Sequence, residues 1–312
     1  MSKKQDSRGL SSLFFIFLPL IYMILSFFVF TYPLPVWVTV VIPIPLYTSL
    51  IFLIAGSFYR SQKTAAFLRM IGWIVFSLYW ATQPLTLYYA EQEDLVNAVL
   101  CVVGIFVLFY LSYREWVSIT HDEYEPSLQW IAGASAIAGF IYFVIEQTSL
   151  APLIINNVAW QSGMLLELFT GPVVINPPYL TYMSAYIRII FACTAIQSMV
   201  IFAGMILPLP NVPWNRKIKG LLITIVPIHV LNLIRNAGIT YLVGIYGNEF
   251  FSIAHNYIGK GGSLLALIVL LLIVTKIVPE VFDHILAITD LPKKPGPLES
   301  MIQPYLKGKK NL

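Results

Sequence analysis

The run VWVTVVIPIPLYTSLIFLIAGSF, from Val36 to Phe58, contains no charged residue. A helix needs about 20 apolar residues to cross the roughly 30 Å hydrocarbon core of a bilayer, so this run predicts a membrane-spanning helix. Pro43 and Pro45 interrupt it, and we expect these prolines, like Pro84 further along the chain, to kink their helices.

Comparable runs recur along the 312 residues, of which 58% are hydrophobic and 11% are charged. Soluble proteins average about 25% charged residues, so this composition excludes a soluble enzyme, and the absence of Lys/Arg blocks excludes a nucleic-acid partner. The sequence predicts an all-α, polytopic transmembrane helical bundle of about eight spans, with an interfacial cap on the outer face. The expected spans are Leu13–Phe30, Val36–Phe58, Met70–Tyr89, Leu95–Leu111, Leu128–Ile145, Ile187–Leu207, Gly220–Ile234 and Ser263–Val278.

The basic residues predict the orientation in the cell membrane. If both termini are cytoplasmic, all but three of the 19 Lys and Arg residues lie on the inner side, as the positive-inside rule requires. The inner charges are then topology signals and headgroup contacts. Lys3, Lys4 and Arg8 precede the first span, which lacks a small-residue cleavage site and reads as a retained anchor. The three outer exceptions, which need another role, are Arg188, Arg235 and Lys260.

We expect one transmembrane domain over residues 1–290, followed by a mobile cytoplasmic tail over 291–312. Its parts are N-terminal spans (13–145), an outer cap (146–186) and spans that carry the chemistry (187–278). Within the cap, Leu153–Phe169 mixes apolar and polar residues, as a helix lying in the membrane interface does. The segment Gly171–Pro178 must be extended because its prolines forbid a continuous helix.

Three residue types used in thiol chemistry are expected at the outer side. Cys193 lies six residues into a span that enters from outside, about 9 Å below the outer edge at 1.5 Å per residue. Arg235 ends a span that starts inside and reaches a similar depth, roughly 8 Å below the same edge. His255 precedes the last span. The second cysteine, Cys101, lies in a separate apolar run and reads as a small apolar filler, so no disulfide is predicted.

Polar neighbours favour a functional site over simpler readings, in which Cys193 is filler, Arg235 snorkels to the headgroups and His255 is an interface histidine. His229, Asn232 and Asn236 share one helical face beside Arg235, and Gln197 lies one turn from Cys193. A buried thiol needs a cation before its thiolate can act as a nucleophile, Arg235 can also bind an oxyanion, and His255 can exchange protons.

Neither a metal nor another cofactor is predicted. One cysteine and two histidines, without a CxxC or HExxH motif or an acidic cluster, do not match a zinc or di-iron pattern. The chain also lacks a Gly-rich phosphate loop. Gly259, Gly261 and Gly262 are typical of a hinge or of close helix packing.

Three short motifs in order resemble the exosortase/archaeosortase family: Phe191-Ala-Cys-Thr-Ala-Ile-Gln-Ser198, Asn232-Leu-Ile-Arg-Asn236 and Ala254-His-Asn256. The resemblance covers roughly Gly171 to Val278. It implies a thiol protease and transpeptidase with Cys193 as nucleophile, Arg235 as cation and His255 as third member. It also implies partners: membrane-anchored precursors with a C-terminal tripartite sorting tail, whose motif would be Pro-Gly-Phe, and a membrane lipid as acceptor. Residues that could support catalysis or bind substrate are Arg188, Gln197, His229, Asn232, Asn236, Asn256 and Lys260.

Two other functions remain open. The polar stripe could line the binding site of a small-solute transporter or sensor. Against this, no inverted repeat is detectable and the first five spans contain no charged residue and no histidine. A lipid-modifying enzyme without a covalent intermediate would not need Cys193 at all.

Overall fold

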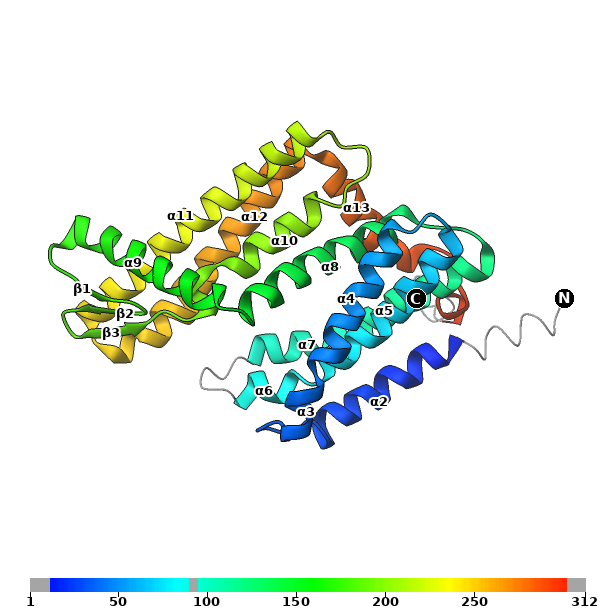
Figure 1. Cartoon of the computed structure of the whole chain (residues 1–312), viewed down its shortest axis with the longest axis horizontal. Coiled ribbons are helices and arrows are strands. Elements are labelled where there is room, and N and C mark those ends of the chain that lie inside the picture. The colour runs from blue at the N-terminus through cyan, green and yellow to red at the C-terminus, as the bar shows by residue number, and fades with distance from the viewer. Residues whose placement is uncertain (1–11, 90–94, 302–312) are drawn as a thin grey trace, which may run out of the picture. The chain divides into compact units, whose positions relative to one another are not determined.

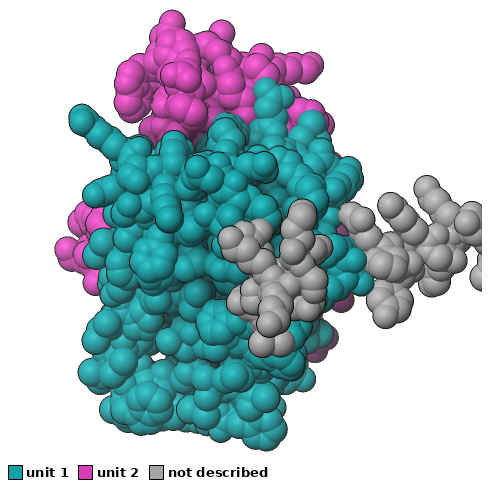
Figure 2. Space-filling view, turned by 90° about the vertical axis from the view of Figure 1, so that its right-hand side faces the viewer, with its two compact units in different colours: residues 1–136, 283–312 teal, residues 137–282 magenta. Residues whose placement is uncertain are grey.

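A computed structural model describes residues 12–89 and 95–301. The described chain is almost entirely helical, with one small antiparallel sheet, which confirms the all-α, polytopic fold. It divides into two compact units, coloured separately in Figure 2: unit 1 comprises residues 1–136 and 283–312, and unit 2 comprises residues 137–282.

Unit 1 contains most of the N-terminal helices. An aromatic core that includes Phe15, Phe109 and Tyr113 holds α2 against α7. Pro43 and Pro84 each begin a new helical segment, as expected for residues that cannot donate a backbone hydrogen bond. The elements are α2 (Phe14–Phe28), α3 (Val36–Val41), α4 (Pro43–Phe58), α5 (Gln62–Ala81), α6 (Pro84–Tyr89), α7 (Leu95–His121), the start of α8 (Pro126–Glu146), the end of α13 (Pro279–Thr289) and the turn η4 (Leu291–Lys293).

A buried ion pair ties α5 to α7. The guanidinium of Arg69 donates two hydrogen bonds to the carboxylate of Glu115, at 2.6 and 3.0 Å, and a third to the carbonyl of Gly56 at 2.7 Å. Both side chains are almost fully buried. Arg69 is therefore an internal structural group, and the expectation that it contacts lipid headgroups is wrong.

The first part of the C-terminal tail packs onto α7. The buried carboxylate of Glu299 accepts hydrogen bonds from Tyr110 at 2.8 Å, Tyr113 at 2.7 Å and Arg114 at 3.1 Å. Leu291 is fully buried. Charge-assisted hydrogen bonds therefore anchor residues 291–301, and the expectation that this segment is mobile is wrong. Residues 302–312 of the predicted tail lie outside the described residues.

Unit 2 is built around the long helix α11. Figure 1 shows α10, α11 and α12 running alongside one another, with α9 and the sheet gathered near one end of α11. Besides the rest of α8 and the start of α13, its elements are α9 (Leu150–Thr170), β1 (Val174–Asn176), β2 (Tyr179–Tyr182), β3 (Ala185–Arg188), η1 (Phe191–Thr194), α10 (Ile196–Ile206), α11 (Trp214–Tyr246), η2 (Asn248–Phe250), η3 (Ile253–Gly259) and α12 (Lys260–Ile277).

Within the described residues, six helical stretches are long and apolar enough to cross a membrane, and α2 and α10 are shorter apolar helices. The predicted number of eight spans is therefore not confirmed. The cytoplasmic location of the termini stays a prediction, as does the division into a transmembrane domain and a tail, and Lys3, Lys4 and Arg8 lie outside the described residues.

Most predicted spans have different boundaries in the structure, and two of the differences concern the region around Cys193 and Arg235. The predicted span Ile187–Leu207 is wrong as a helix, because Ile187 belongs to β3 and α10 begins only at Ile196. Pairing of β3 with β2 competes successfully with helix formation in this apolar run. The predicted span Gly220–Ile234 is too short, since α11 continues through the polar residues around Arg235 to Tyr246.

The predicted outer cap contains α9 and the sheet. The extended conformation expected from the prolines is confirmed at β1, which pairs with β2. The loop after β2 is tied to α11, because Ser184 Oγ donates to the carbonyl of Gly244 at 2.9 Å. A Cβ at Gly244 would lie 2.9 Å from the carbonyl oxygen of Tyr182, so only glycine permits this approach. The interfacial location of α9 stays a prediction.

We predict that Glu115→Gln strongly destabilises the protein. It leaves the buried charge of Arg69 without a counter-ion, and breaking one partner of a buried pair costs about 3–5 kcal/mol. Thermal unfolding in detergent, followed by loss of the monodisperse size-exclusion peak, measures the effect.

Asp290→Asn is the matched control. It removes the partner of Lys293 in a pair whose side chains are 79% and 51% exposed, where about 0–1 kcal/mol is expected. Equal shifts in the two variants would contradict a structural role for the buried pair.

Candidate functional site

Cys193 lies in a short 3-10 turn rather than inside a transmembrane helix. Its amide donates to the carbonyl of Ile190 at 2.8 Å, and the hydroxyl of Thr194 donates to Phe191 at 2.7 Å. Ala195 then adopts a left-handed conformation, with φ of 59°, before α10 begins. The expectation that Cys193 lies inside a continuous helix is therefore wrong, and its depth below the outer edge stays a prediction. The thiol is placed by a tight turn, and the side chain is half-buried.

Two asparagines of α11 bind this turn directly. Asn232 Nδ2 donates to the carbonyl oxygen of Cys193 at 2.8 Å, and Asn236 Nδ2 donates to the same oxygen at 3.0 Å. Both asparagines are buried. Their spacing of four residues puts both on one face of α11, as the sequence pattern predicts.

Arg235 lies between these asparagines in sequence, on the same helix. It is half-buried and within range of an electrostatic interaction with Cys193. Its Nε is buried without a hydrogen-bond partner in the described part of the chain. Because α11 extends to Tyr246, Arg235 lies inside the helix, and the expectation that it ends a span is wrong.

The π-helix η3 packs beside this arginine. A Cβ at Gly259 would lie 2.9 Å from Arg235 Nε and 3.1 Å from the carbonyl oxygen of Ala254. Ala254 is fully buried in a cluster with Ile239 of α11. π-Helical turns are frequent at functional sites. Gly259 therefore leaves room for the guanidinium, which agrees with the close packing expected there, whereas a Cβ at Gly261 or Gly262 would meet nothing within 4 Å.

His255 is carried by the same π-helix. Its ring stacks on Phe251 with centroids 5.2 Å apart, and Nδ1 is 3.2 Å from Oδ1 of Asn256. The side chain is half-buried, so it can exchange protons with solvent or substrate. Helix α11 thus contacts both the turn that bears Cys193 and the π-helix that bears His255.

The cap helix α9 covers the cysteine turn. Cys193 packs against an apolar cluster that includes Val158 and Ala159 of α9 and Leu180 of β2. One polar contact joins α9 to α11, since His229 Nε2 and Gln161 Oε1 are 2.7 Å apart. Gln161 lies within the predicted cap segment Leu153–Phe169, and periodicity within either helix could not have paired it with His229.

The other predicted residues are not joined to the cysteine turn by the contacts described above. Gln197 is exposed on α10, and the left-handed Ala195 breaks the helical register expected to place it one turn from Cys193. Arg188 is exposed at the end of β3, and Lys260 is exposed at the start of α12. Asn256 is exposed and contacts His255 and Ser252 on its own helix.

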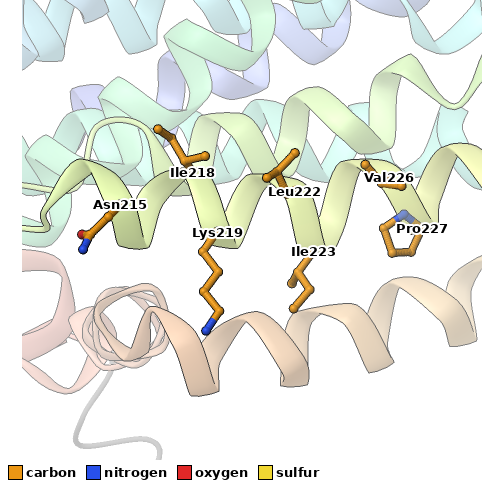
Figure 3. A pocket seen from close by; sticks show the side chains of 7 residues that line it. All are labelled: Asn215, Ile218, Lys219, Leu222, Ile223, Val226 and Pro227. Carbon is orange, nitrogen blue, oxygen red and sulfur yellow. The ribbon is translucent and has the colours of Figure 1, made fainter.

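A separate hollow of about 690 Å³ follows the N-terminal half of α11, and all seven lining residues lie on that helix (Figure 3). Its lining is apolar apart from Asn215 and Lys219 and includes neither Cys193 nor Arg235, so we do not place the chemistry there. Among the described residues, no group of three or more His, Cys, Asp and Glu could hold a metal ion. The absence of a metal or cofactor stays a prediction.

Comparison with known proteins identifies the family. The model of the family described as transmembrane exosortase matches residues 44–274, which is most of the chain and includes all three motifs. The chain belongs to the transmembrane exosortase family. This confirms the resemblance and, with the apolar helices, a multi-pass membrane protein.

Two relatives of this exosortase-family chain are named archaeosortase A. The chain is 27% identical to the protein from Natronomonas pharaonis over 202 residues, covering 60% of this chain and 61% of the relative. It is 24% identical to the protein from Haloferax volcanii over 208 residues, covering 59% and 65%. The chain thus spans less than two thirds of the length of these relatives. No solved structure matches it.

We predict that Arg235→Gln and Gly259→Ala both slow alkylation of Cys193. The first removes the cation that we expect to stabilise the thiolate, and the second displaces it. A charge-assisted interaction is worth about 1.5–3 kcal/mol, so a decrease of about tenfold or more is expected for Arg235→Gln. Iodoacetamide labelling at pH 7, in a Cys101→Ser background and quantified by mass spectrometry, measures the rate.

Gly262→Ala is the control for the glycine, because a Cβ there would meet nothing within 4 Å. It should leave the rate unchanged. If Gly259→Ala behaves like Gly262→Ala, the glycine does not position the arginine.

Proposed function

We propose that this exosortase-family protein is a membrane-embedded cysteine transpeptidase that cleaves surface-protein precursors near a C-terminal sorting tail. One observation carries the proposal: the helix that binds the backbone of Cys193 through Asn232 and Asn236 also carries Arg235, which lies between these two asparagines in sequence. A thiol and a guanidinium held by one helix match the requirements of acyl transfer.

In the first half of the proposed reaction, the Cys193 thiolate attacks the carbonyl carbon of the scissile peptide bond. Arg235 stabilises the thiolate and then the tetrahedral oxyanion, and it stays protonated throughout. The C–N bond breaks, and His255 donates a proton to the departing amine. The products are an acyl-thioester on Cys193 and the released C-terminal tail.

In the second half, a hydroxyl of a membrane lipid attacks the thioester carbonyl. His255 accepts the proton of that hydroxyl, the C–S bond breaks, and the thiolate is regenerated. The precursor is then joined to the lipid through an ester. The apolar contact of α9 with Cys193 supports a shielding role for the cap, since water would otherwise hydrolyse the thioester.

The partners follow from this chemistry. The precursor tail, itself an apolar helix with a basic end, would present its scissile bond at the outer interface of the cell membrane. The names of the two relatives, archaeosortase A, support a sorting role. The tripeptide Pro-Gly-Phe is the recognition motif that the family resemblance implies, and we carry it into the proposal on that ground alone. We place both termini in the cytoplasm and the site at the outer face, from the charge distribution.

The contacts of the polar stripe favour this function over a small-solute transporter or sensor. Asn232 and Asn236 bind the Cys193 carbonyl, and His229 contacts Gln161. These side chains therefore hold protein groups in place, whereas a transport site would leave them facing an open path.

We predict that Cys193→Ala and Cys193→Ser both abolish processing of a tagged precursor. The alanine removes the nucleophile, and a serine hydroxyl is far less ionised than a thiol at neutral pH. Precursor and product are followed by gel mobility in cells that lack other processing enzymes. Continued cleavage in both variants would exclude thiol catalysis and favour a lipid-modifying enzyme without a covalent intermediate.

Arg235→Lys is the second probe of the same mechanism. Lysine keeps the charge but loses the planar fork of donors. Loss of processing with unchanged alkylation of Cys193 would assign the guanidinium to the oxyanion rather than to the thiolate.

We predict that Gln161→Ala raises the ratio of hydrolysed to lipid-linked product. The substitution removes the contact with His229 and loosens α9 over Cys193, which admits water to the thioester. Mass spectrometry of the processed C-terminus measures the ratio. Asn157→Ala, one turn earlier on α9 and exposed, is the control, and equal ratios in the two variants would contradict cap shielding.

A further inference from the structure

The carbonyl oxygen of Cys193 receives two side-chain hydrogen bonds from consecutive turns of one helix. Asn232 donates at 2.8 Å and Asn236 at 3.0 Å. A carbonyl oxygen has two lone pairs, so this pair of donors saturates it. Both asparagines are nearly buried, at 7% and 3% exposure, which makes each unmade hydrogen bond costly.

This carbonyl needs such partners because of the local backbone. In a continuous helix it would accept from the amide four residues later. The left-handed Ala195 turns the chain away, and a backbone bond of the new helix runs from the amide of Met199 to the carbonyl of Ala195. The asparagines therefore replace the helical partner that the turn cannot provide.

We propose that Asn232 and Asn236 are positioning residues that hold the Cys193 peptide in register with Arg235. Fixing the carbonyl fixes the orientation of the turn, and with it the direction of the Cα–Cβ bond that carries the sulfur. Asn232, Arg235 and Asn236 all belong to α11. Fixing the cysteine turn to the two asparagines therefore also fixes the position of the thiol relative to the guanidinium. A displacement of about 1 Å can cost roughly a hundredfold in rate.

The inference rests on the proposed function for its effect on processing, but its effect on thiol reactivity does not. The experiment compares Asn232→Ala, Asn236→Ala and the double variant by three measurements: the rate of precursor processing, iodoacetamide alkylation of Cys193 in the Cys101→Ser background, and the unfolding temperature in detergent. Thr240→Val is the matched control, since Thr240 is buried one turn beyond Asn236 and its hydroxyl donates to the carbonyl of Asn236 at 2.9 Å rather than to the cysteine turn.

Each single variant keeps one donor on the carbonyl, so we expect processing to fall about threefold to tenfold. The double variant should lose more than about a hundredfold, which exceeds the product of the single losses, because the two bonds hold one atom and are coupled. Alkylation should slow in the double variant as the sulfur leaves the range of Arg235. Thr240→Val should keep both rates.

The direction of the alkylation change separates positioning from simple stabilisation. If the asparagines only stabilise the fold, their loss loosens the turn and exposes the sulfur, so alkylation becomes faster, which overturns the proposal. Processing losses that only follow the folded fraction also overturn it, and Asn236→Leu provides a second test if the double variant does not fold. This uncharged, near-isosteric change removes a donor and should slow alkylation without a large change of volume. If Cys193→Ala still processes precursor while the asparagine variants slow alkylation, the proposed function fails and the positioning role stands.

Discussion

The double hydrogen bond from α11 to the Cys193 carbonyl is the constraint on which the site depends. A reactive thiol must be close to a cation, yet it must also be exposed to an incoming substrate, so it cannot lie in the middle of a packed helix. A 3-10 turn that ends in a left-handed residue meets this need but leaves its carbonyl without a helical partner. Asn232 and Asn236 supply the missing donors and, by doing so, join the nucleophile to the helix that carries Arg235.

Other elements of unit 2 pack around this contact between α11 and the cysteine turn. The cap helix α9 packs on the cysteine turn, and the sheet is tied to α11 through Ser184 and the close approach of Tyr182 to Gly244. On another side of Arg235, the π-helix η3 brings Gly259 close to the guanidinium. The buried arginines of unit 1 differ from Arg235, because Arg69 and Arg114 each form an ion pair with a carboxylate of the same unit. In this part of the chain, buried cations stabilise structure and need no catalytic explanation.

The membrane class, most spans and the residue types of the site could be predicted from the sequence. A long run without charged residues can span a bilayer, because placing a charged side chain in the hydrocarbon core costs free energy. The amino-acid composition of the run is therefore enough to predict the span. The stripe of Asn232 and Asn236 beside Arg235 was also predictable, since helical periodicity alone places these residues together. The buried pairing of Arg69 was not, because a basic residue at the inner side of a span has the same local pattern whether it contacts lipid or Glu115.

Composition and helical periodicity are enough to establish a polytopic helical protein with a cysteine, an arginine and a histidine in a defined order. How the cysteine turn is joined to the helix that carries Arg235 depends on tertiary contacts. The turn at Cys193 forms because β3 pairs with β2 and because donors from α11, 39 and 43 residues away, satisfy its carbonyl. The contact of Gln161 with His229 and the space beside Gly259 likewise join segments distant in the chain. Such contacts depend on packing between elements, and hydropathy and periodicity describe only the elements themselves.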